Sequence, residues 1–257
     1  MDRLDTILVT KGLVVSRARA TYEIKNGNVL VDGKVVTKPS KNIDINSEIV
    51  INNKFDYVSK GALKLLKAIN SFNIDLNNKV MLDIGSSTGG FTDVALRNNI
   101  KKVIAVDVGT NQFNDELKKD KRVELHESTD IRDLVLKENI DLVTIDISFI
   151  SVTKIIDKII EINPKEIILL IKPQFECGKE IADLYKGIPL NKEVHKNVIN
   201  NIINSFIKIN YNVQNLTYSP ILGGSGNIEY LSYLNKEETK IIEINKVINE
   251  AFNYLKK

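Results

Sequence analysis

The sequence contains a single cysteine and no long apolar run. One cysteine, Cys177, excludes a disulfide framework and a multi-cysteine zinc site. No stretch reaches the roughly 18 consecutive apolar residues of a membrane-spanning helix. The N-terminal segment MDRLDTILVTKG is charged and has no secretion-signal apolar region. We therefore expect a cytoplasmic protein without disulfides, a metal site or a membrane span.

The chain also lacks a large charge imbalance. Its 36 Lys and Arg against 33 Asp and Glu give a net charge of +3, and 43% hydrophobic residues are typical of a globular protein. The excess is localised, because residues 1–60 hold ten basic and seven acidic residues while the rest hold 26 of each. This placement favours a polyanionic partner for the N-terminal part.

The first 55 residues predict a small α+β domain. Apolar residues at helical spacing predict a short helix before Lys11-Gly12, and Ser16 predicts the N-cap of a second helix over 17–26. Asp32-Gly33 between two apolar runs predicts a β-hairpin, followed by a strand at 48–51. We expect residues 1–55 and 56–257 to form separate domains.

Residues 56–257 alternate apolar strands with helices. A helix is expected over 59–71, and the expected strands are 80–85, 103–108, 123–126, 142–147 and 167–171, with helices over 91–97, 150–160 and 192–209. This pattern predicts a parallel sheet between helices. Strands 212–218 and 228–233 have no helix between them and predict an antiparallel hairpin, before a helical tail over 237–255. The expected fold class is α/β, with a Rossmann-like, mostly parallel sheet whose last strand is antiparallel.

The segment DIGSSTGG, from Asp83 to Gly90, joins a strand to a helix. Its G-x-x-x-G-G spacing differs from the G-x-G-x-x-G of nucleotide dehydrogenases. Asp83 would repel a pyrophosphate but suits the ammonium group of a methionine moiety. Asp107, 22 residues after Gly85, has the spacing of an acid that accepts ribose hydroxyls. The loop predicts an S-adenosylmethionine site, and the alternative is a tight turn with an incidental Asp.

Ten residues are expected to form this cofactor site. They are Asp83, Gly85, Ser86, Ser87, Thr88, Gly89, Gly90, Phe91, Asp107 and Asp130. Asp130 follows the third strand, where an adenine contact and a plain helix N-cap are both open.

Charged residues also stand at the predicted carboxyl edge of the sheet, where ligands of open α/β sheets bind. Asp146 and Lys172 end two strands, and Glu229 begins the antiparallel one. Lys64, on the preceding helix, could reach the same edge. Two lysines and two acids beside a methyl donor suit transfer to a poorly acidic hydroxyl. The alternative for each residue is a surface salt bridge.

Several motifs together make a family resemblance. In order, VSKGALKL, LDIGSSTGGFT, VIAVDVG, DISFIS, IKPQFECGK and SGNIEYL resemble the TlyA (haemolysin A-type) family of rRNA 2′-O-methyltransferases, relatives of the FtsJ RNA methyltransferases. The resemblance runs from Arg3 to about Leu234. The first domain resembles the RNA-binding domain named after ribosomal protein S-four.

The resemblance implies a Lys-Asp-Lys-Glu catalytic tetrad of Lys64, Asp146, Lys172 and Glu229. It implies 2′-O-methylation of a cytidine in 23S rRNA, 16S rRNA or both, with rRNA or ribosomal subunits as partners and the protein as a monomer. The candidate RNA-binding residues are Arg3, Lys11, Arg17, Arg19, Lys34, Lys38 and Lys60. The sequence departs from the family pattern at Leu63, where His is usual, at Tyr22-Glu23-Ile24, which is often more basic, and at Asp130, where Asn is common.

Three alternatives to this function are considered. A membrane-active haemolysin is suggested by the family's other name, and a non-catalytic rRNA-binding assembly factor would keep the fold. Cys177 could be the nucleophile of a base-carbon methyltransferase, although a lone cysteine is more often structural. His126 and His195 have no second metal ligand at useful spacing.

Overall fold

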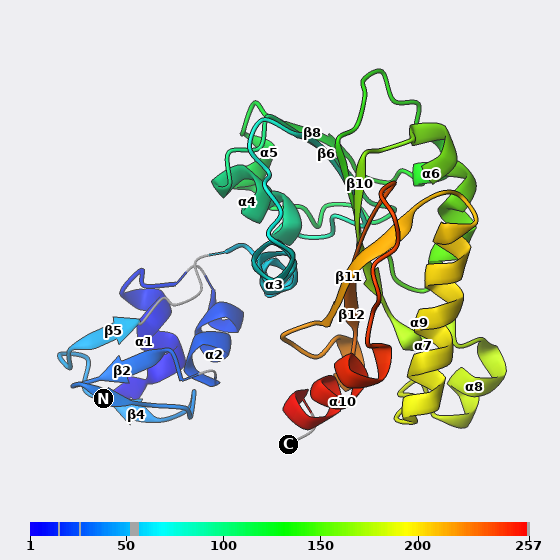
Figure 1. Cartoon of the computed structure of the whole chain (residues 1–257). Coiled ribbons are helices and arrows are strands. Elements are labelled where there is room, and N and C mark those ends of the chain that lie inside the picture. The colour runs from blue at the N-terminus through cyan, green and yellow to red at the C-terminus, as the bar shows by residue number, and fades with distance from the viewer. Residues whose placement is uncertain (15, 26, 52–56, 256–257) are drawn as a thin grey trace. The chain divides into compact units, whose positions relative to one another are not determined.

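The computed structural model describes residues 1–14, 16–25, 27–51 and 57–255. The chain divides into two compact units, Met1–Asp56 and Tyr57–Lys257. The boundary expected between residues 55 and 56 lies outside the described residues. Each unit has its own secondary structure (Figure 1), and the two are described separately.

The N-terminal unit packs two helices on small sheets. Its elements are β1 (Asp2–Arg3), α1 (Leu4–Thr10), α2 (Arg17–Lys25), β2 (Val29–Val31), β3 (Lys34–Val35), β4 (Asn42–Ile43) and β5 (Ile49–Ile51). The strands form a β3-β2-β5 sheet and a β1-β4 pair. Leu4, Ile7 and Leu8 of α1 pack with the buried side of β2 and with Ile24 of α2.

Local signals explain this unit. The Ser16 hydroxyl accepts a hydrogen bond from the Arg19 N–H at 3.2 Å, as an N-cap does. Asp32 and Gly33 have φ of +48° and +73°, the left-handed pair of a two-residue hairpin turn. Asn26, the expected last residue of the second helix, lies outside the described residues.

The second unit contains a seven-stranded sheet. Its strands are β6 (Val80–Ile84), β7 (Lys102–Val106), β8 (Val123–His126), β9 (Leu142–Ile145), β10 (Glu166–Ile171), β11 (Asn212–Tyr218) and β12 (Tyr230–Asn235). Their order is β11-β12-β10-β9-β6-β7-β8. The run from β8 to β10 is parallel, and β12 is antiparallel to both β10 and β11. The predicted fold class is confirmed.

Helices cover both faces of this sheet. They are α3 (Ala62–Phe72), α4 (Gly90–Arg97), α5 (Asp115–Lys118), α6 (Ile156–Ile162), α7 (Pro173–Glu176), α8 (Lys179–Leu184), α9 (Lys192–Ile207) and α10 (Ile244–Leu255), with 3-10 turns at Ile131–Asp133, Val152–Ile155 and Gly224–Gly226. Figure 1 shows α6 and α9 on one side and α4 and α5 on the other. Alternate strand residues, such as Leu82 and Ile84, enter the core beneath α6 and α9.

The tail differs from the expectation, because α10 begins at Ile244 rather than at 237. The side chains of Asn212 and Gln214 donate to the carbonyl oxygens of Glu237 and Glu238, at 2.8 and 3.0 Å. The N–H of Lys240 bonds to the carbonyl of Val213 at 3.2 Å. These bonds hold residues 237–240 along β11 and leave their backbone unavailable for a helix.

Candidate active site

Four charged side chains meet at the carboxyl edge of the sheet. Lys172 and Glu229 lie just beyond the paired ends of β10 and β12. Asp146 directly follows β9, the other neighbour of β10. Lys64 reaches this edge from the first turn of α3. The structure therefore brings together the four residues proposed as the tetrad.

These residues form a continuous chain of ion pairs. Lys64 Nζ lies 2.8 Å from Glu229 Oε2 and 3.5 Å from Asp146 Oδ2. Asp146 Oδ1 lies 2.5 Å from Lys172 Nζ. Lys172 Nζ also donates to Ser148 Oγ at 2.8 Å. Asp146 thus stands between two cations and fixes their separation.

Burial makes this pairing necessary. Lys64, Lys172 and Glu229 are only 8%, 5% and 2% exposed, and a buried charge without a partner is strongly destabilising. Burial is the largest single influence on the pKa of Lys64 and lowers it. The attraction of Asp146 and Glu229 outweighs burial, so the pKa of Lys64 is raised above its usual value and its ammonium stays charged.

Gln174, in α7, is a site residue that the sequence reasoning missed. It is 9% exposed, and its Nε2 donates to Glu229 Oε1 at 3.1 Å. Its position two residues after Lys172 was the available signal. The contact joins residues 55 apart in the chain, so only the fold reveals it.

Two cavities meet at this edge. One of 440 Å³ lies between the ends of β6, β7 and β9, and Asp107, Asp130 and Asp146 are among the residues that line it. The other, of 530 Å³, is lined by the four charged residues of the ion-pair chain and by Gln174. Both cavities share five lining residues, namely Gly85, Ser87, Asp146, Ser148 and Phe149. A group bound in the first cavity would therefore reach the ion-pair chain.

Asp107 lies at the mouth of the loop, as predicted for a ribose-binding acid. Its Oδ2 accepts from the Ser87 N–H at 2.8 Å and its Oδ1 from the Gly109 N–H at 2.7 Å. Asp130 lines the same cavity and also caps a 3-10 turn, accepting from the Arg132 N–H at 2.9 Å. The Arg132 guanidinium lowers the pKa of Asp130. Both alternatives for Asp130 are thus compatible with its position.

Ile84, Gly85 and Ser87 are the residues of the DIGSSTGG segment that line the cavities. Gly85 has φ of +81°, and a Cβ there would lie 2.7 Å from the carbonyl oxygen of Asp146. Glycine is therefore required for the close approach of the loop to the end of β9.

The rest of the loop is placed by packing. A Cβ on Gly89 would meet Leu117 at 2.6 Å, and one on Gly90 would meet the Ser59 hydroxyl at 2.3 Å. Ser86 and Phe91 are buried and Thr88 is exposed. These five residues are not among those that line either cavity in the described part of the chain.

Asp83 lies behind the loop rather than in the cavity. It points to the α4 side of the sheet, is fully buried, and accepts hydrogen bonds of 2.8 Å from the hydroxyls of Thr92 and Thr144. Burial raises the pKa of Asp83 to about 6, against the effect of these two bonds. Its carboxylate therefore connects the loop helix to β9.

Phe149 is one of the residues that line both cavities. It is 88% exposed, has φ of +70°, and its ring centroid lies 5.3 Å from that of Phe175. A left-handed conformation is unfavourable for a bulky residue and clusters at functional sites. The backbone thus holds an aromatic ring in solvent beside the ion-pair chain.

The arginines proposed to bind RNA are oriented by acids of the N-terminal unit. Arg3 and Arg17 contact Asp5 at 2.7 and 3.3 Å, and Asp5 is 3% exposed. Arg19 pairs with the buried Glu23 at 2.6 Å. These pairs leave the arginine side chains 33–62% exposed, so further donors remain at the surface.

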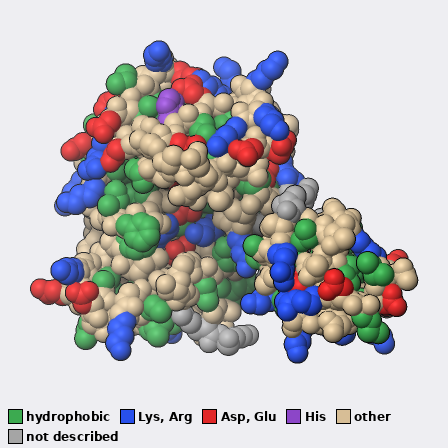
Figure 2. Space-filling model, turned by 180° about the vertical axis from the view of Figure 1, so that it is seen from behind, with side chains coloured by type: hydrophobic (Ala, Val, Ile, Leu, Met, Phe, Trp, Pro, Cys, Tyr) green, Lys and Arg blue, Asp and Glu red, His purple; other side chains and the backbone are tan. Residues whose placement is uncertain are grey.

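The proposed RNA-binding lysines are all exposed, namely Lys11, Lys34 and Lys38 in the N-terminal unit and Lys60 in the second. Figure 2 shows basic side chains gathered on part of the visible face of the N-terminal unit.

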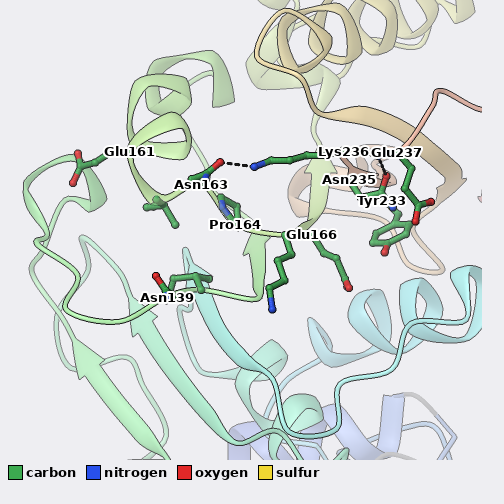
Figure 3. Close-up of a pocket in the computed structure, with 12 residues that line it drawn as sticks. Asn139, Glu161, Asn163, Pro164, Glu166, Tyr233, Asn235, Lys236 and Glu237 are labelled. Carbon is green, nitrogen blue, oxygen red and sulfur yellow. Dashed lines mark hydrogen bonds between the residues drawn. The ribbon is translucent and has the colours of Figure 1, made fainter.

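A larger hollow, of 900 Å³, lies at the opposite edge of the sheet, around Pro164 and Lys236 (Figure 3). Two of its charged groups, Lys236 and Glu166, have partners. Lys236 bonds to Asn163, and Glu166 pairs with Lys79 at 2.7 Å. The proposed catalytic and cofactor residues lie at the other edge of the sheet, so this hollow is separate from the candidate active site.

The surroundings of Cys177 and of the two histidines do not favour the roles considered for them. Burial raises the pKa of Cys177, which disfavours a thiolate nucleophile. Both ring nitrogens of His195 bond at 2.7 Å to protein oxygens, and His126 lies 2.8 Å from Glu124. Within the described residues, no helix combines the length and apolarity needed to cross a membrane.

The sheet order, the glycine loop and the acid at the end of β7 define a Rossmann-like methyltransferase joined to a small N-terminal domain. Family models match accordingly, as "FtsJ-like methyltransferase" over residues 57–236 and "S4 domain" over residues 2–49. The chain therefore belongs to the FtsJ-like methyltransferase family. The predicted cofactor, S-adenosylmethionine, is confirmed with it.

The chain is similar along most of its length to named relatives. It is 40% identical to Hemolysin A of Brachyspira hyodysenteriae, covering 90% of this chain and 98% of that protein. It is 36% identical to the 23S rRNA (cytidine-2′-O)-methyltransferase TlyA of Campylobacter jejuni, over 89% and 97%. For the 16S/23S rRNA (cytidine-2′-O)-methyltransferase TlyA of Mycobacterium tuberculosis, the identity is 32% over 93% and 92%. The predicted family resemblance is confirmed.

Solved structures agree. A protein of Streptococcus thermophilus, described provisionally as a hemolysin, matches with a TM-score of 0.76 and 35% identity, covering 99% of this chain and 97% of that one. A similarly described protein of Lactococcus lactis matches with a TM-score of 0.72 and 41% identity, over 77% and 99%.

Proposed function

We propose that this protein transfers a methyl group from S-adenosylmethionine to the ribose 2′-hydroxyl of a cytidine in ribosomal RNA. The observation that carries the proposal is the buried chain Glu229–Lys64–Asp146–Lys172 beside the loop cavity. The names of the Campylobacter and Mycobacterium relatives supply the rRNA and the cytidine.

The residues around the smaller cavity fit the cofactor. Asp107 would accept the ribose hydroxyls, and the apolar side chains of Ile131 and Ile155 line the same cavity and suit an adenine ring. When bound, S-adenosylmethionine supplies a methyl group on a positively charged sulfur. The Asp146 carboxylate, shared by both cavities, favours a cation at their junction. Asp83 would act indirectly, by holding the loop helix against β9.

Lys172 is the proposed acceptor of the hydroxyl proton. Asp146 and Ser148 hold its Nζ from two sides, which fixes the nitrogen at the junction of the cavities. A lysine accepts a proton through its lone pair, so Lys172 acts in its neutral form. Methyl transfer releases one proton from the 2′-hydroxyl, and this proton passes to Lys172 Nζ.

Lys64 and Glu229 serve a different role. The raised pKa of Lys64 keeps it cationic, so it is unsuited to be the base. Its charge offsets those of Asp146 and Glu229, and its contact with Asp146 holds that carboxylate aligned on Lys172. Positioning of this kind is a large part of catalysis when no covalent intermediate is needed.

RNA contacts would come from both units. The arginines oriented by Asp5 and Glu23 offer fork-shaped donors suited to phosphates. The exposed ring of Phe149 suits stacking on an unpaired base near the ribose. Such stacking would help to hold a target nucleotide out of its helix.

Lys172→Ala tests the proposal. Transfer of labelled methyl groups to ribosomal subunits that lack the modification should fall by about 100- to 10,000-fold, the usual contribution of a general base. Binding of S-adenosylmethionine, measured by calorimetry, should stay nearly unchanged. Lys165→Ala removes a lysine from the opposite edge, where it pairs with Asp141, and should leave transfer intact. Full activity of Lys172→Ala would refute the assignment.

A further inference from the structure

Glu229 is held by more than its ion pair with Lys64. It is 2% exposed, and its two oxygens face different partners. Oε2 meets Lys64 Nζ at 2.8 Å, while Oε1 accepts from Gln174 Nε2 at 3.1 Å. The carboxylate is thus clamped between a cation of α3 and an amide of α7.

The orientation of the Gln174 amide follows from its neighbour. With the amide reversed, Gln174 Oε1 would face the carboxylate, and two acceptors would be opposed without a proton between them. In the observed orientation Gln174 Oε1 is buried and makes no hydrogen bond within the described residues. The side chain therefore leaves one acceptor unsatisfied, which costs about 1–3 kcal/mol for a buried polar group, and gains the bond to Glu229.

Gly223 provides the space for this arrangement. A Cβ on Gly223 would lie 2.1 Å from Glu229 Oε1 and 2.4 Å from Glu229 Cδ. Its φ of −72° is open to any residue, so glycine is required here by space and not by backbone conformation. The next residue, Gly224, has nothing within 4 Å of the same methyl position.

We propose that Gln174 is a positioning residue of the methyl-transfer site, which keeps the Glu229 carboxylate aligned on Lys64, and that Gly223 reserves the space for that carboxylate. The inference rests on the proposed function. The groups that set the charge around Glu229 are Lys64 directly, and Asp146 and Lys172 through the ion-pair chain. Without the amide donor, the Glu229 carboxylate can rotate away from Lys64. Lys64 then depends on Asp146, and Asp146 is drawn away from Lys172.

Gln174→Met keeps the length of the side chain and removes the donor, while Gln174→Glu places a second carboxylate beside Glu229. We expect kcat for methyl transfer to ribosomal subunits to fall by about 10- to 100-fold, as for other residues that orient site ligands. The loss should fall on kcat rather than on KM for the subunits, and it should be larger in Gln174→Glu than in Gln174→Met. The affinity for S-adenosylmethionine, measured by calorimetry, should stay unchanged because Gln174 does not line that cavity.

Gly223→Ala and Gly224→Ala form a matched pair that does not alter Gln174. The first should reproduce the selective loss of kcat, and the second should leave kcat unchanged. An unchanged kcat in both Gln174 variants and in Gly223→Ala would overturn the inference. If either Gln174 variant fails to fold, as seen by circular dichroism, the glycine pair decides the question. A fully active Lys172→Ala would instead remove the proposed function itself.

Discussion

The buried carboxylate of Asp83 should destabilise the folded protein at neutral pH, and Asp83→Asn should remove this effect. Burial raises the pKa of Asp83 from 3.8 to about 6. Each pKa unit corresponds to roughly 1.4 kcal/mol, so the ionised carboxylate disfavours folding by about 3 kcal/mol at most. The hydrogen bonds from Thr92 and Thr144 are already included in that value.

The direction with pH follows from proton linkage. Because the folded state binds the Asp83 proton more tightly than the unfolded state, the unfavourable contribution is fully present above pH 6. It disappears as the pH falls from about 6 towards 3.8. At about pH 8, Asp83→Asn should therefore be the more stable protein, and its advantage should shrink by up to about 3 kcal/mol at acidic pH.

Urea unfolding of both proteins, followed by circular dichroism because the chain has no tryptophan, measures this difference. Other titrating groups are common to both proteins and cancel in the comparison. A stability difference that does not change with pH would refute the burial argument. Calorimetry on Asp83→Asn measures the affinity for the cofactor and tests separately whether Asp83 contacts it. Direct contact between Asp83 and the methionine ammonium predicts a large loss of cofactor affinity, whereas a position behind the loop predicts a small one.

Two further outcomes are expected. Phe149→Ala should weaken binding to ribosomal subunits by about 1–3 kcal/mol, the range for loss of one stacked base, without changing cofactor affinity; equal subunit binding, in a filter assay, would exclude stacking. Asp5→Asn should lower the stability of the N-terminal unit by about 1 kcal/mol, because Arg3 and Arg17 lose a charged partner. These arginines lower the pKa of Asp5 well below its ordinary value of 3.8. The difference from wild type should therefore be fully present above about pH 4 and decrease progressively as the pH falls further, as thermal unfolding at several pH values would show.

The sequence could predict what depends on local patterns. The parallel strands were readable from short apolar runs, and the end of each run located Asp146 and Lys172 at one edge. The antiparallel last strand placed Glu229 there as well. Because the carboxyl ends of parallel strands share an edge, topology alone was enough to bring these residues together.

What remained hidden depends on contacts between distant segments. The sequence predicts that Gly89 and Gly90 contact the cofactor. In the structure, the absence of a side chain at these two positions leaves room for Leu117 and Ser59. The carboxylate of Asp83 could not be assigned to one face of the sheet without knowing that α4 covers it. Gln174 could not be found this way because its partner, Glu229, lies 55 residues further along the chain, and no local spacing encodes that pairing.

Asp146 lines both the 440 Å³ cavity and the 530 Å³ cavity, so the charge of the ion-pair chain acts on both. Two lysines and two carboxylates sum to zero, so burying the set avoids an uncompensated charge. When Lys172 is neutral and ready to accept a proton, the same four side chains carry a net charge of −1. That negative charge attracts the sulfonium of the methyl donor at the junction of the cavities. After transfer the same sulfur is a neutral thioether, which the charge does not attract. Under the proposed function, the arrangement would favour the methyl donor over its product at the stage when Lys172 acts. Asp146, which lines both cavities, would link the cofactor to the proposed proton acceptor.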